Sequence, residues 1–509
     1  MNTMSSATEL KEASRYLVES AMELTDYVRA QARESGAAHE VEKGIWKRVL
    51  QLGLWALHHF FACAGDGDVG AEVDLPDGRR VRRWPELQVR QYHSVFGALS
   101  LGRAVYGSRQ GQRIEHVPLD ARLQLPEGKF SYLLQDWDQF LVVEEPYAGV
   151  SDRLSRILGF SQSVDSLERM NRKTAALVPD FFDSLPTPAR EQEGEIVVAS
   201  ADGKGVPMRR RVEQAPIEGH RPKRGPKPNT KKMALLGTVY TVDPLRRTPE
   251  EVVASLFRDP KDPAHEERPG RPKPRHKRVR ASLARSAAGT TEPAAEEIFG
   301  WLAREVDARN PGGTKPLCVL MDGQESQWRA AQQFLSGENV TEILDLLHVT
   351  PRIWSAAHLF HAEGSPAALK FVKQRVVRVL KGNVSSVTAT LRWMADYRGL
   401  SARKKEQLAK ICDFLDKNRD RMRYDEYLEA GYPIATGVIE GACRHLVKDR
   451  LERAGMRWVL QGAQSMLHLR SVHLSGLWDE FTAYRIKRER QRLYPYALES
   501  DGYPLADAA

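Results

Sequence analysis

Ile196-Val-Val-Ala-Ser-Ala-Asp202 and Leu317-Cys-Val-Leu-Met-Asp322 are two short apolar runs, and each ends in an aspartate that a glycine follows. Runs of this length, bounded by turn residues, are typical of strands buried on both faces. Asp-Gly also occurs at 66, 77 and 501, where it is a common turn pair, but only at 202 and 322 does it follow such a run. We therefore expect Asp202 and Asp322 at the carboxyl ends of central strands, where ligands bind in open α/β sheets.

A third acidic residue, Glu440, lies near the start of an amphipathic helical pattern, Thr436-Gly-Val-Ile-Glu-Gly-Ala-Cys-Arg-His-Leu-Val. Ile439, Cys443 and Leu446 would anchor this helix in the core. Glu440 is then expected at the edge of the buried face, pointing at the sheet. Arg444, one turn further on, is expected to pair with Glu440 when no metal is bound.

The remaining pattern of residues 195–350 alternates between strand and helix. Strands are predicted at 195–201, 233–242, 317–322 and 341–346, with a helix over 294–306. Residues 351–430 have only helical patterns, and a helix-rich segment follows over 437–490. The fold class predicted from these patterns is an α/β core with an all-helical insertion.

Two stretches interrupt the core pattern, at 208–232 and 259–285. Both are rich in proline, glycine and positive charge, as in His220-Arg-Pro-Lys-Arg-Gly-Pro-Lys-Pro and Arg268-Pro-Gly-Arg-Pro-Lys-Pro-Arg. Such segments are typical of surface loops. Because they flank the strand of Asp202, we expect them to clamp a DNA backbone.

The N-terminal part is predicted to be mainly helical, with a small β element. Residues 8–64 indicate two helices broken near Ser35-Gly36, and 92–106 indicate a hairpin or small sheet. Residues 150–158 and 164–177 then form two helical patterns around the turn Gly159-Phe-Ser-Gln. This pattern is typical of a helix-turn-helix whose second helix, with Arg169, Arg172 and Lys173, reads DNA; an ordinary helix pair in a core fits it equally well.

The composition favours a nucleic-acid partner. The 509 residues contain 76 Lys and Arg against 67 Asp and Glu, a net charge of +9. Basic surfaces attract phosphate backbones, although excess charge also serves solubility alone. The four cysteines include no CxxC pair, the N-terminus lacks a signal-peptide pattern, and no apolar stretch approaches a membrane span. We expect a cytoplasmic, nucleoid-associated protein without a membrane partner.

Three carboxylates and an excess of basic charge suit magnesium chemistry on a phosphodiester. Magnesium prefers oxygen ligands and retains several waters, so Asp202, Asp322 and Glu440 would suffice with phosphate oxygens. Mn²⁺ is expected to substitute. The chain has no GxxxxGK[ST] loop, no HExxH and no GxSxG, which argues against a nucleotide-driven ATPase, a zincin and an α/β-hydrolase.

Asp345 and His348 form a further cluster in Ile343-Leu-Asp-Leu-Leu-His-Val, where a strand passes into a helix. Three residues apart, they are expected to share one face. From the residues alone, Asp345 as the N-cap of that helix, with His348 packed nearby, is favoured over a functional pair.

These blocks resemble those of DDE transposases of the ISKra4-like insertion-sequence family. The resemblance lies in Ser200-Ala-Asp-Gly-Lys-Gly-Val, Val319-Leu-Met-Asp-Gly-Gln, Ile343-Leu-Asp-Leu-Leu-His-Val, and Gly437-Val-Ile-Glu-Gly-Ala-Cys-Arg-His-Leu-Val-Lys-Asp-Arg followed by Ala454-Gly-Met-Arg-Trp. It spans about residues 200–470. It implies an RNase H-like fold, with Asp202, Asp322 and Glu440 as catalytic metal ligands and a helical insertion before Glu440. It also favours Asp345 and His348 as accessory residues of the site.

The resemblance implies a bacterial mobile-element enzyme that binds terminal inverted repeats, cleaves the DNA ends and joins the freed 3′-hydroxyl to target DNA. It would act on double-stranded DNA as a homodimer or larger assembly, without a nucleotide cofactor. His348 is expected to contact the scissile phosphate. Further DNA contacts are expected from Lys204, Arg444, Lys448, Arg450 and Arg457, while Trp458 would either stack on an unpaired base or lie in the core.

The predicted domain organisation has six segments: an N-terminal helical region with a hairpin (1–120), a helix-turn-helix region (121–190), the first part of the catalytic core (191–350), a helical insertion (351–430), the final Glu helix with C-terminal helices (431–490), and a tail (491–509). Two other functions remain open. One is an RNase H-like nuclease or resolvase without strand transfer, and the other is a domesticated, non-catalytic DNA-binding protein.

Overall fold

The computed structural model describes residues 3–109, 111, 113–209, 231–257, 271–283, 285–287, 290–292 and 294–495. The chain divides into two compact units, one formed by residues 1–177 and 479–509, the other by 178–478. Among the described residues, no helix is both long enough and apolar enough to cross a membrane.

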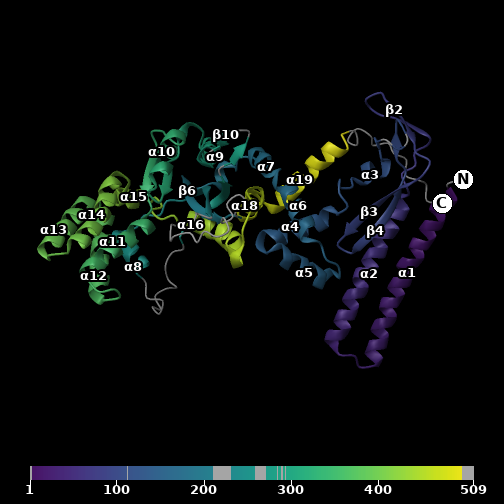
Figure 1. Ribbon diagram of the computed structural model, residues 1–509, viewed down its shortest axis with the longest axis horizontal. Coiled ribbons are helices and arrows are strands. Elements are labelled where there is room, and N and C mark those ends of the chain that lie inside the picture. The colour runs from purple at the N-terminus through teal and green to yellow at the C-terminus, as the bar shows by residue number, and fades with distance from the viewer. Residues whose placement is uncertain are drawn as a thin grey trace, which may run out of the picture. The chain divides into compact units, whose positions relative to one another are not determined.

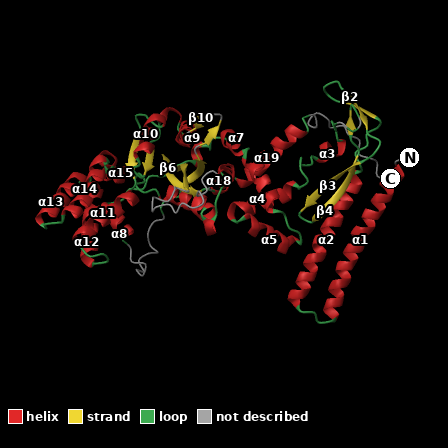
Figure 2. Ribbon diagram, in the orientation of Figure 1, coloured by secondary structure: helices red, strands yellow, loops and turns green. Residues whose placement is uncertain are grey.

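The first unit begins with two long helices, α1 (Thr3–Arg33) and α2 (Ala38–Ala64), which Figure 2 shows side by side. The two helices predicted for residues 8–64 are thereby confirmed. Strands β3 (Gln88–Ser94) and β4 (Gly97–Arg103) form the predicted hairpin. A second small sheet, which was not predicted, has the order β1-β2-β5 and consists of β1 (Glu72–Asp74), β2 (Arg80–Arg83) and β5 (Tyr106–Gly107).

Helices complete this unit: α3 (Pro118–Leu123), α4 (Tyr132–Glu144), α5 (Tyr147–Leu158), α6 (Val164–Ala175) and, from the far end of the chain, α19 (Trp478–Leu493). Helix α5 ends at Gly159, whose φ of 80° is the left-handed conformation that glycine adopts readily. Helix α6 begins at Ser163, whose side chain accepts a hydrogen bond from the amide of Ser166. The predicted pair of helices around a tight turn is therefore present, as α5 and α6.

The second unit is built on a five-stranded mixed sheet with the order β12-β11-β6-β7-β8. Its strands are β6 (Ile196–Pro207), β7 (Lys231–Val242), β8 (Arg275–Leu283), β11 (Leu317–Met321) and β12 (Val340–Leu344). Strands β6, β11 and β12 are parallel to one another, whereas β7 is antiparallel to both β6 and β8. Four of these strands agree with those predicted from sequence. A short hairpin of β9 (Arg285–Ala287) and β10 (Thr290–Glu292) follows β8.

The two faces of the sheet carry separate cores, because successive side chains of a strand point to opposite faces. Val197, Ala199 and Ala201 of β6 pack with the residues of α9 (Ala294–Arg309) and α10 (Glu325–Phe334). Ile196 and Val198 pack on the other side, in a cluster that continues into the helices after β12. By the same alternation, Asp202 lies on the face of the sheet that carries Ile196 and Val198.

Helices follow β12 without an intervening strand, as predicted for residues 351–430. They are α11 (Leu346–Phe360), α12 (Pro366–Leu380), α13 (Val384–Tyr397), α14 (Ala402–Lys417) and α15 (Tyr424–Ala430), and Figure 1 shows the first four grouped beside the sheet. The unit is completed by α7 (Val178–Ser184), α8 (Pro249–Leu256), α16 (Gly437–Ala442), a π-helical turn (Cys443–Lys448), α17 (Asp449–Leu451) and α18 (Leu460–Leu474), with single 3₁₀ turns at Arg190–Gln192, Pro311–Gly313, Arg419–Arg421 and Arg453–Gly455.

The prediction of one basic surface loop over 259–285 is wrong for its second half, which contains the edge strand β8. Arg278 and Arg280 of this strand are buried, because carboxylates of α9 face them. Arg278 Nη1 lies 2.9 Å from Glu305, and Arg280 Nη2 lies 3.2 Å from Glu297. These two guanidiniums hold α9 on the sheet and are not available to clamp DNA. Residues 210–230 and 258–270, to which the remaining loop predictions apply, lie outside the described residues.

Replacing Glu305 with alanine is expected to destabilise the second unit by about 3–5 kcal/mol. Glu305 is 7% exposed and binds both Arg278 and Arg309, so its loss leaves Arg278 buried without its carboxylate and Arg309 with Glu193 alone, at 3.6 Å. The measurement is the shift of the urea unfolding transition followed by circular dichroism. Arg304→Ala on the same helix is the matched control: Arg304 is 62% exposed, pairs with Asp183 at 3.5 Å, and should change stability by less than about 0.5 kcal/mol. Equal effects of the two substitutions would contradict the role given to the buried pair.

Candidate metal centre

Asp202 lies within β6 rather than at its end. β6 pairs with β11 only through Val197–Ala199 and then continues to Pro207 as a hairpin with β7. Asp202 therefore lies just beyond the part of β6 that pairs with β11, in the part that pairs with β7 alone. Its Oδ1 accepts a hydrogen bond from the amide of Gly203 at 2.6 Å, and its Oδ2 accepts one from the thiol of Cys443 at 3.0 Å. The expectation that Asp202 ends its strand is corrected accordingly.

Asp322 follows β11 directly, as predicted. The next residue, Gly323, has a φ of 97°, and a Cβ there would lie 2.9 Å from Leu344 Cδ1, so the turn requires glycine. This turn brings the amide of Gln324 within 3.0 Å of Asp322 Oδ1. The Asp-Gly pair thus fixes the aspartate at the carboxyl end of β11 instead of making a hairpin turn.

Glu440 lies in the short helix α16 and is exposed, while Ile439, Cys443 and Leu446 are buried as predicted. The helix widens into a π-helical turn at Cys443, an irregularity common at functional sites. Arg470 of α18, 1% exposed, supports this turn by donating hydrogen bonds to the carbonyls of Leu446, at 3.1 Å, and His445. The buried arginine thus fixes the helix that carries Glu440.

Asp345 is the N-cap of α11, as the sequence favoured, and it does more than cap. Its Oδ1 accepts hydrogen bonds from the amides of Leu347, at 2.9 Å, and Thr436, at 3.2 Å. Its Oδ2 accepts from the Thr436 hydroxyl and lies 2.8 Å from His348 Nδ1. Both oxygens of this fully buried carboxylate are therefore engaged, and they join the start of α11 to the start of α16.

His348 shares a small space with acidic groups. Ligand atoms of Asp345, His348 and Glu440 all lie within 4.8 Å of one another, the one group among the described residues with the donors and spacing of a cation site. Because a carboxylate accepts hydrogen bonds, His348 Nδ1 is the donor in its hydrogen bond with Asp345. The other ring nitrogen of His348 is left for a ligand.

The charges of Asp202 and Asp322 act on members of this group: that of Asp322 on His348, and that of Asp202 on Glu440. The hydrogen bond that His348 donates to Asp345 raises the pKa of His348, burial opposes it, and the charges of Asp345, Asp322 and Glu440 raise it further. Burial raises the pKa of Glu440, and so do the negative charges of Asp345 and Asp202, against the opposing effect of His348. Each of the three predicted carboxylates is thus close enough to alter a proton equilibrium in the cluster.

The donor set fits a hard divalent cation. Of the three predicted ligands, Glu440 belongs to this group, whereas Asp202 and Asp322 are not among its donors. The carboxylate oxygens of all three are of the kind that Mg²⁺ and Mn²⁺ prefer. Asp345 is a poor ligand despite its position, because both of its oxygens already accept two hydrogen bonds each. It orients His348 and Thr436 instead.

Two of the residues predicted to contact DNA near this site are buried. Arg450 is 0% exposed, with its guanidinium 5.1 Å from the ring of Trp458. Trp458 is 8% exposed and donates to the carbonyl of Leu451 at 3.0 Å, which corresponds to the core alternative. A direct DNA contact by either side chain is incompatible with this packing, so both predictions are corrected.

The other predicted contacts remain accessible to different degrees. Lys448 and Arg457 are exposed, and Lys204 is half-buried beside Asp202. Arg444 is exposed and lies 3.8 Å from Asp449, so the pair predicted with Glu440 is replaced by a pair with Asp449. In the first unit, Arg169 and Arg172 pair with Asp165 and Glu168 on their own helix, and Lys173 pairs with Glu127 and Glu489.

Three residues that shape the site were not identified from sequence as part of it: Cys443, Thr436 and Arg470. Cys443 was predicted only as a core anchor, yet its thiol contacts Asp202. Its position three residues after Glu440 is the signal that could have revealed this, since such residues share a helix face. For Thr436 and Arg470 the sequence contains no comparable signal.

Asp345→Asn is expected to lower the pKa of His348 in the metal-free protein, because the hydrogen bond that His348 donates to Asp345 is the largest cause of its elevation. The measurement is an NMR titration of the histidine ring. Glu440→Gln is the comparison: it should lower the same pKa by less, because Glu440 acts on His348 only through its charge. A pKa of His348 that does not change in Asp345→Asn would contradict the geometry.

No family model matches the sequence, and no curated protein matches it. Among solved structures, the chain is similar to the Drosophila P element transposase strand transfer complex, with 12% sequence identity over 73% of this chain and 86% of that chain. The TM-score is 0.24. At this score the similarity does not establish a shared fold.

Proposed function

We propose that the chain is a metal-dependent DNA transposase of the DDE type, with Asp202, Asp322 and Glu440 as its catalytic carboxylates. The observation that supports the proposal is that the charges of Asp202 and Asp322 act on members of one group, formed by Asp345, His348 and Glu440. Asp202 is hydrogen-bonded to Cys443, three residues after Glu440, and the charges of Asp322 and Glu440 both act on His348.

We infer that the five-stranded sheet is an RNase H-like core, as the resemblance to ISKra4-like transposases implies. In chain order, three antiparallel strands, β6, β7 and β8, are followed by two strands, β11 and β12, parallel to the first. The first strand is central and carries Asp202, and Asp322 follows its parallel neighbour. Helices α11–α15 would then be the insertion between the second and third carboxylates.

Asp202, Asp322 and Glu440 would hold the metal, Mg²⁺ with Mn²⁺ as a substitute. When bound, a pair of such ions supplies charge neutralisation at the phosphodiester and an activated hydroxyl for in-line displacement. The sheet keeps the two aspartates in fixed positions, while the helix of Glu440 brings the third carboxylate from a separate part of the chain. Preorganised ligands of this kind lower the reorganisation needed during reaction.

His348 is proposed to donate a hydrogen bond to the scissile phosphate through the ring nitrogen that Asp345 leaves free. The elevated pKa of His348 favours the protonated ring, in which both nitrogens are donors. Lys204, Lys448 and Arg457 would contact the DNA backbone nearby. In the first unit, α5 and α6 are proposed to bind the terminal inverted repeats as a helix-turn-helix.

Strand transfer joins two DNA ends to a target, so we propose that the enzyme acts as a dimer or larger assembly on DNA. A nuclease or resolvase would use the same carboxylates without joining. The two are separated by supplying a labelled element end with a free 3′-hydroxyl and target DNA: joined products identify the transposase, and cleaved, unjoined products identify the nuclease.

Asp202→Ala, Asp322→Ala and Glu440→Ala are each expected to reduce Mg²⁺-dependent nicking of the element end by at least about 100-fold, because each would remove a carboxylate ligand of the metal that acts on the phosphodiester. Nicking is measured on a labelled duplex, and DNA binding is measured in parallel by fluorescence anisotropy. Binding should be retained in all three variants. A protein that binds but never nicks, even unaltered, would instead be the non-catalytic DNA-binding protein.

Asp449→Ala and Glu452→Ala are the matched controls on the same segment as Glu440. Asp449 pairs with His445 at 2.9 Å, and Glu452 pairs with Lys231 at 2.5 Å, so neither side chain is held at the carboxylate cluster. Both variants should nick the end at rates close to that of the unaltered protein. Loss of nicking in one of them, with Glu440→Ala active, would move the third ligand to that residue.

A further inference from the structure

Helix α19 returns to the first unit from the opposite end of the chain. Thr482 Oγ1 donates to Asp136 Oδ1 at 2.9 Å, Arg485 donates to Gln135 at 2.8 Å, and the hydroxyl of Tyr494 donates to the carbonyl of Leu125 at 2.6 Å. These bonds fix α19 against α4 and the segment before it. They also bring the basic run of α19 beside α6, the second helix of the helix-turn-helix.

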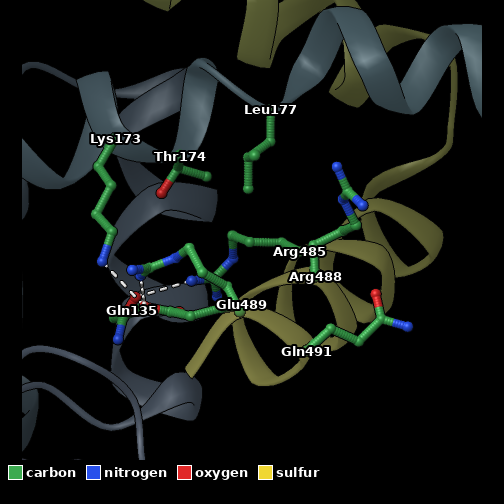
Figure 3. Close-up of a pocket in the computed structure, with 9 residues that line it drawn as sticks. Gln135, Lys173, Thr174, Leu177, Arg485, Arg488, Glu489 and Gln491 are labelled. Carbon is green, nitrogen blue, oxygen red and sulfur yellow. Dashed lines mark hydrogen bonds and ion pairs between the residues drawn. The ribbon is translucent and has the colours of Figure 1, made fainter. Parts of the chain in front are cut away.

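A pocket of about 430 Å³ lies between α6 and α19. Figure 3 shows Lys173 and Thr174 on one side of it and Arg485 and Arg488 on the other. Glu489 and Arg492 also line it. Its volume is within the range of pockets that take a small ligand or one segment of a larger one.

The pocket has an excess of positive charge after its internal ion pairs are counted. Lys173 contacts both Glu127, at 2.6 Å, and Glu489, at 2.9 Å, and Arg492 contacts the same two carboxylates at 2.8 and 3.9 Å. These two cations balance the two carboxylates. Arg488 remains as a positive charge without a carboxylate partner among the lining residues, whereas the charges of Glu489 and Asp136 act on Arg485.

The two remaining guanidiniums differ in a way that suits an anion site. Arg485 is 5% exposed and fixed by Gln135, so its position is rigid. Arg488 is exposed, and no ion pair involves it within the part of the chain that the structure describes. A rigid and a free guanidinium at one pocket match the planar, two-donor recognition of a phosphate group.

We propose that this pocket seats a backbone phosphate of bound DNA, held by Arg485 and Arg488 beside the helix-turn-helix. The inference rests on the DNA-binding part of the proposed function and assigns it a second contact, outside the metal centre. Contacts to phosphates fix the register of a recognition helix, and they commonly come from elements next to it. The C-terminal helix thus completes the DNA-binding surface of the N-terminal unit.

Arg488→Ala in the full chain is expected to weaken binding of a DNA duplex about 8-fold at ~0.1 M salt and to reduce the slope of log K against log salt by about 0.9, the contribution of one phosphate contact. Binding is measured by fluorescence anisotropy in EDTA over a series of salt concentrations, so the metal centre does not contribute. Lys487→Ala is the matched control. It removes the same charge from an exposed position on α19 that does not line the pocket, and should weaken binding less than about 2-fold.

The outcomes are distinguishable. If the unaltered protein binds DNA and Arg488→Ala binds it equally well with the same salt slope, the pocket assignment is overturned and the proposed function is unaffected. If the unaltered protein does not bind DNA at all, the proposed function itself fails. Calorimetry with adenosine monophosphate and with inorganic phosphate tests a free ligand: Arg488-dependent binding of either one that DNA does not displace overturns the DNA assignment.

Discussion

Repulsion between carboxylates sets what the surroundings of His348 must provide. The charges of Asp322, Asp345 and Glu440 act on His348, and the charge of Asp202 acts on Glu440. Like charges near one another destabilise a fold unless nearby donors or cations offset them. The chain offsets part of this repulsion itself. Gly203 and Cys443 donate to Asp202, Gln324 donates to Asp322, and four donors converge on Asp345.

Glu440 is the member of the cluster left without such donors among the interactions described above. It lies on the solvent side, at the start of a helix whose π turn is held by a buried arginine, Arg470. An arrangement that preorganises two carboxylates and leaves a third open to solvent suits a cation that binds together with substrate.

Sequence reasoning succeeded where local pattern and burial agree. The strands of Asp202 and Asp322 are apolar because both of their faces are covered, and the helix of Glu440 shows its buried stripe at Ile439, Cys443 and Leu446. Asp345 was favoured as an N-cap for the same local reason, and the structure has it there. The same local patterns gave the two helices α5 and α6 and the turn between them.

Prediction from sequence failed where the partners of a residue come from distant parts of the chain. Strand β8 has the composition of a loop, and its arginines are buried only because Glu297 and Glu305 of α9 meet them. Arg450 is a residue type that commonly contacts DNA, but here its guanidinium packs against the ring of Trp458. The contact of Cys443 with Asp202 and the return of α19 to the first unit likewise depend on tertiary packing that no local pattern contains.

A crystal of the protein soaked with Mn²⁺ tests whether the three carboxylates form one metal site, because anomalous scattering locates the metal independently of any activity. We expect anomalous density coordinated by Asp202 and Asp322, with Glu440 within coordinating distance of the same site. Density bound elsewhere, or bound to Asp345 and His348 without either aspartate, would contradict this expectation.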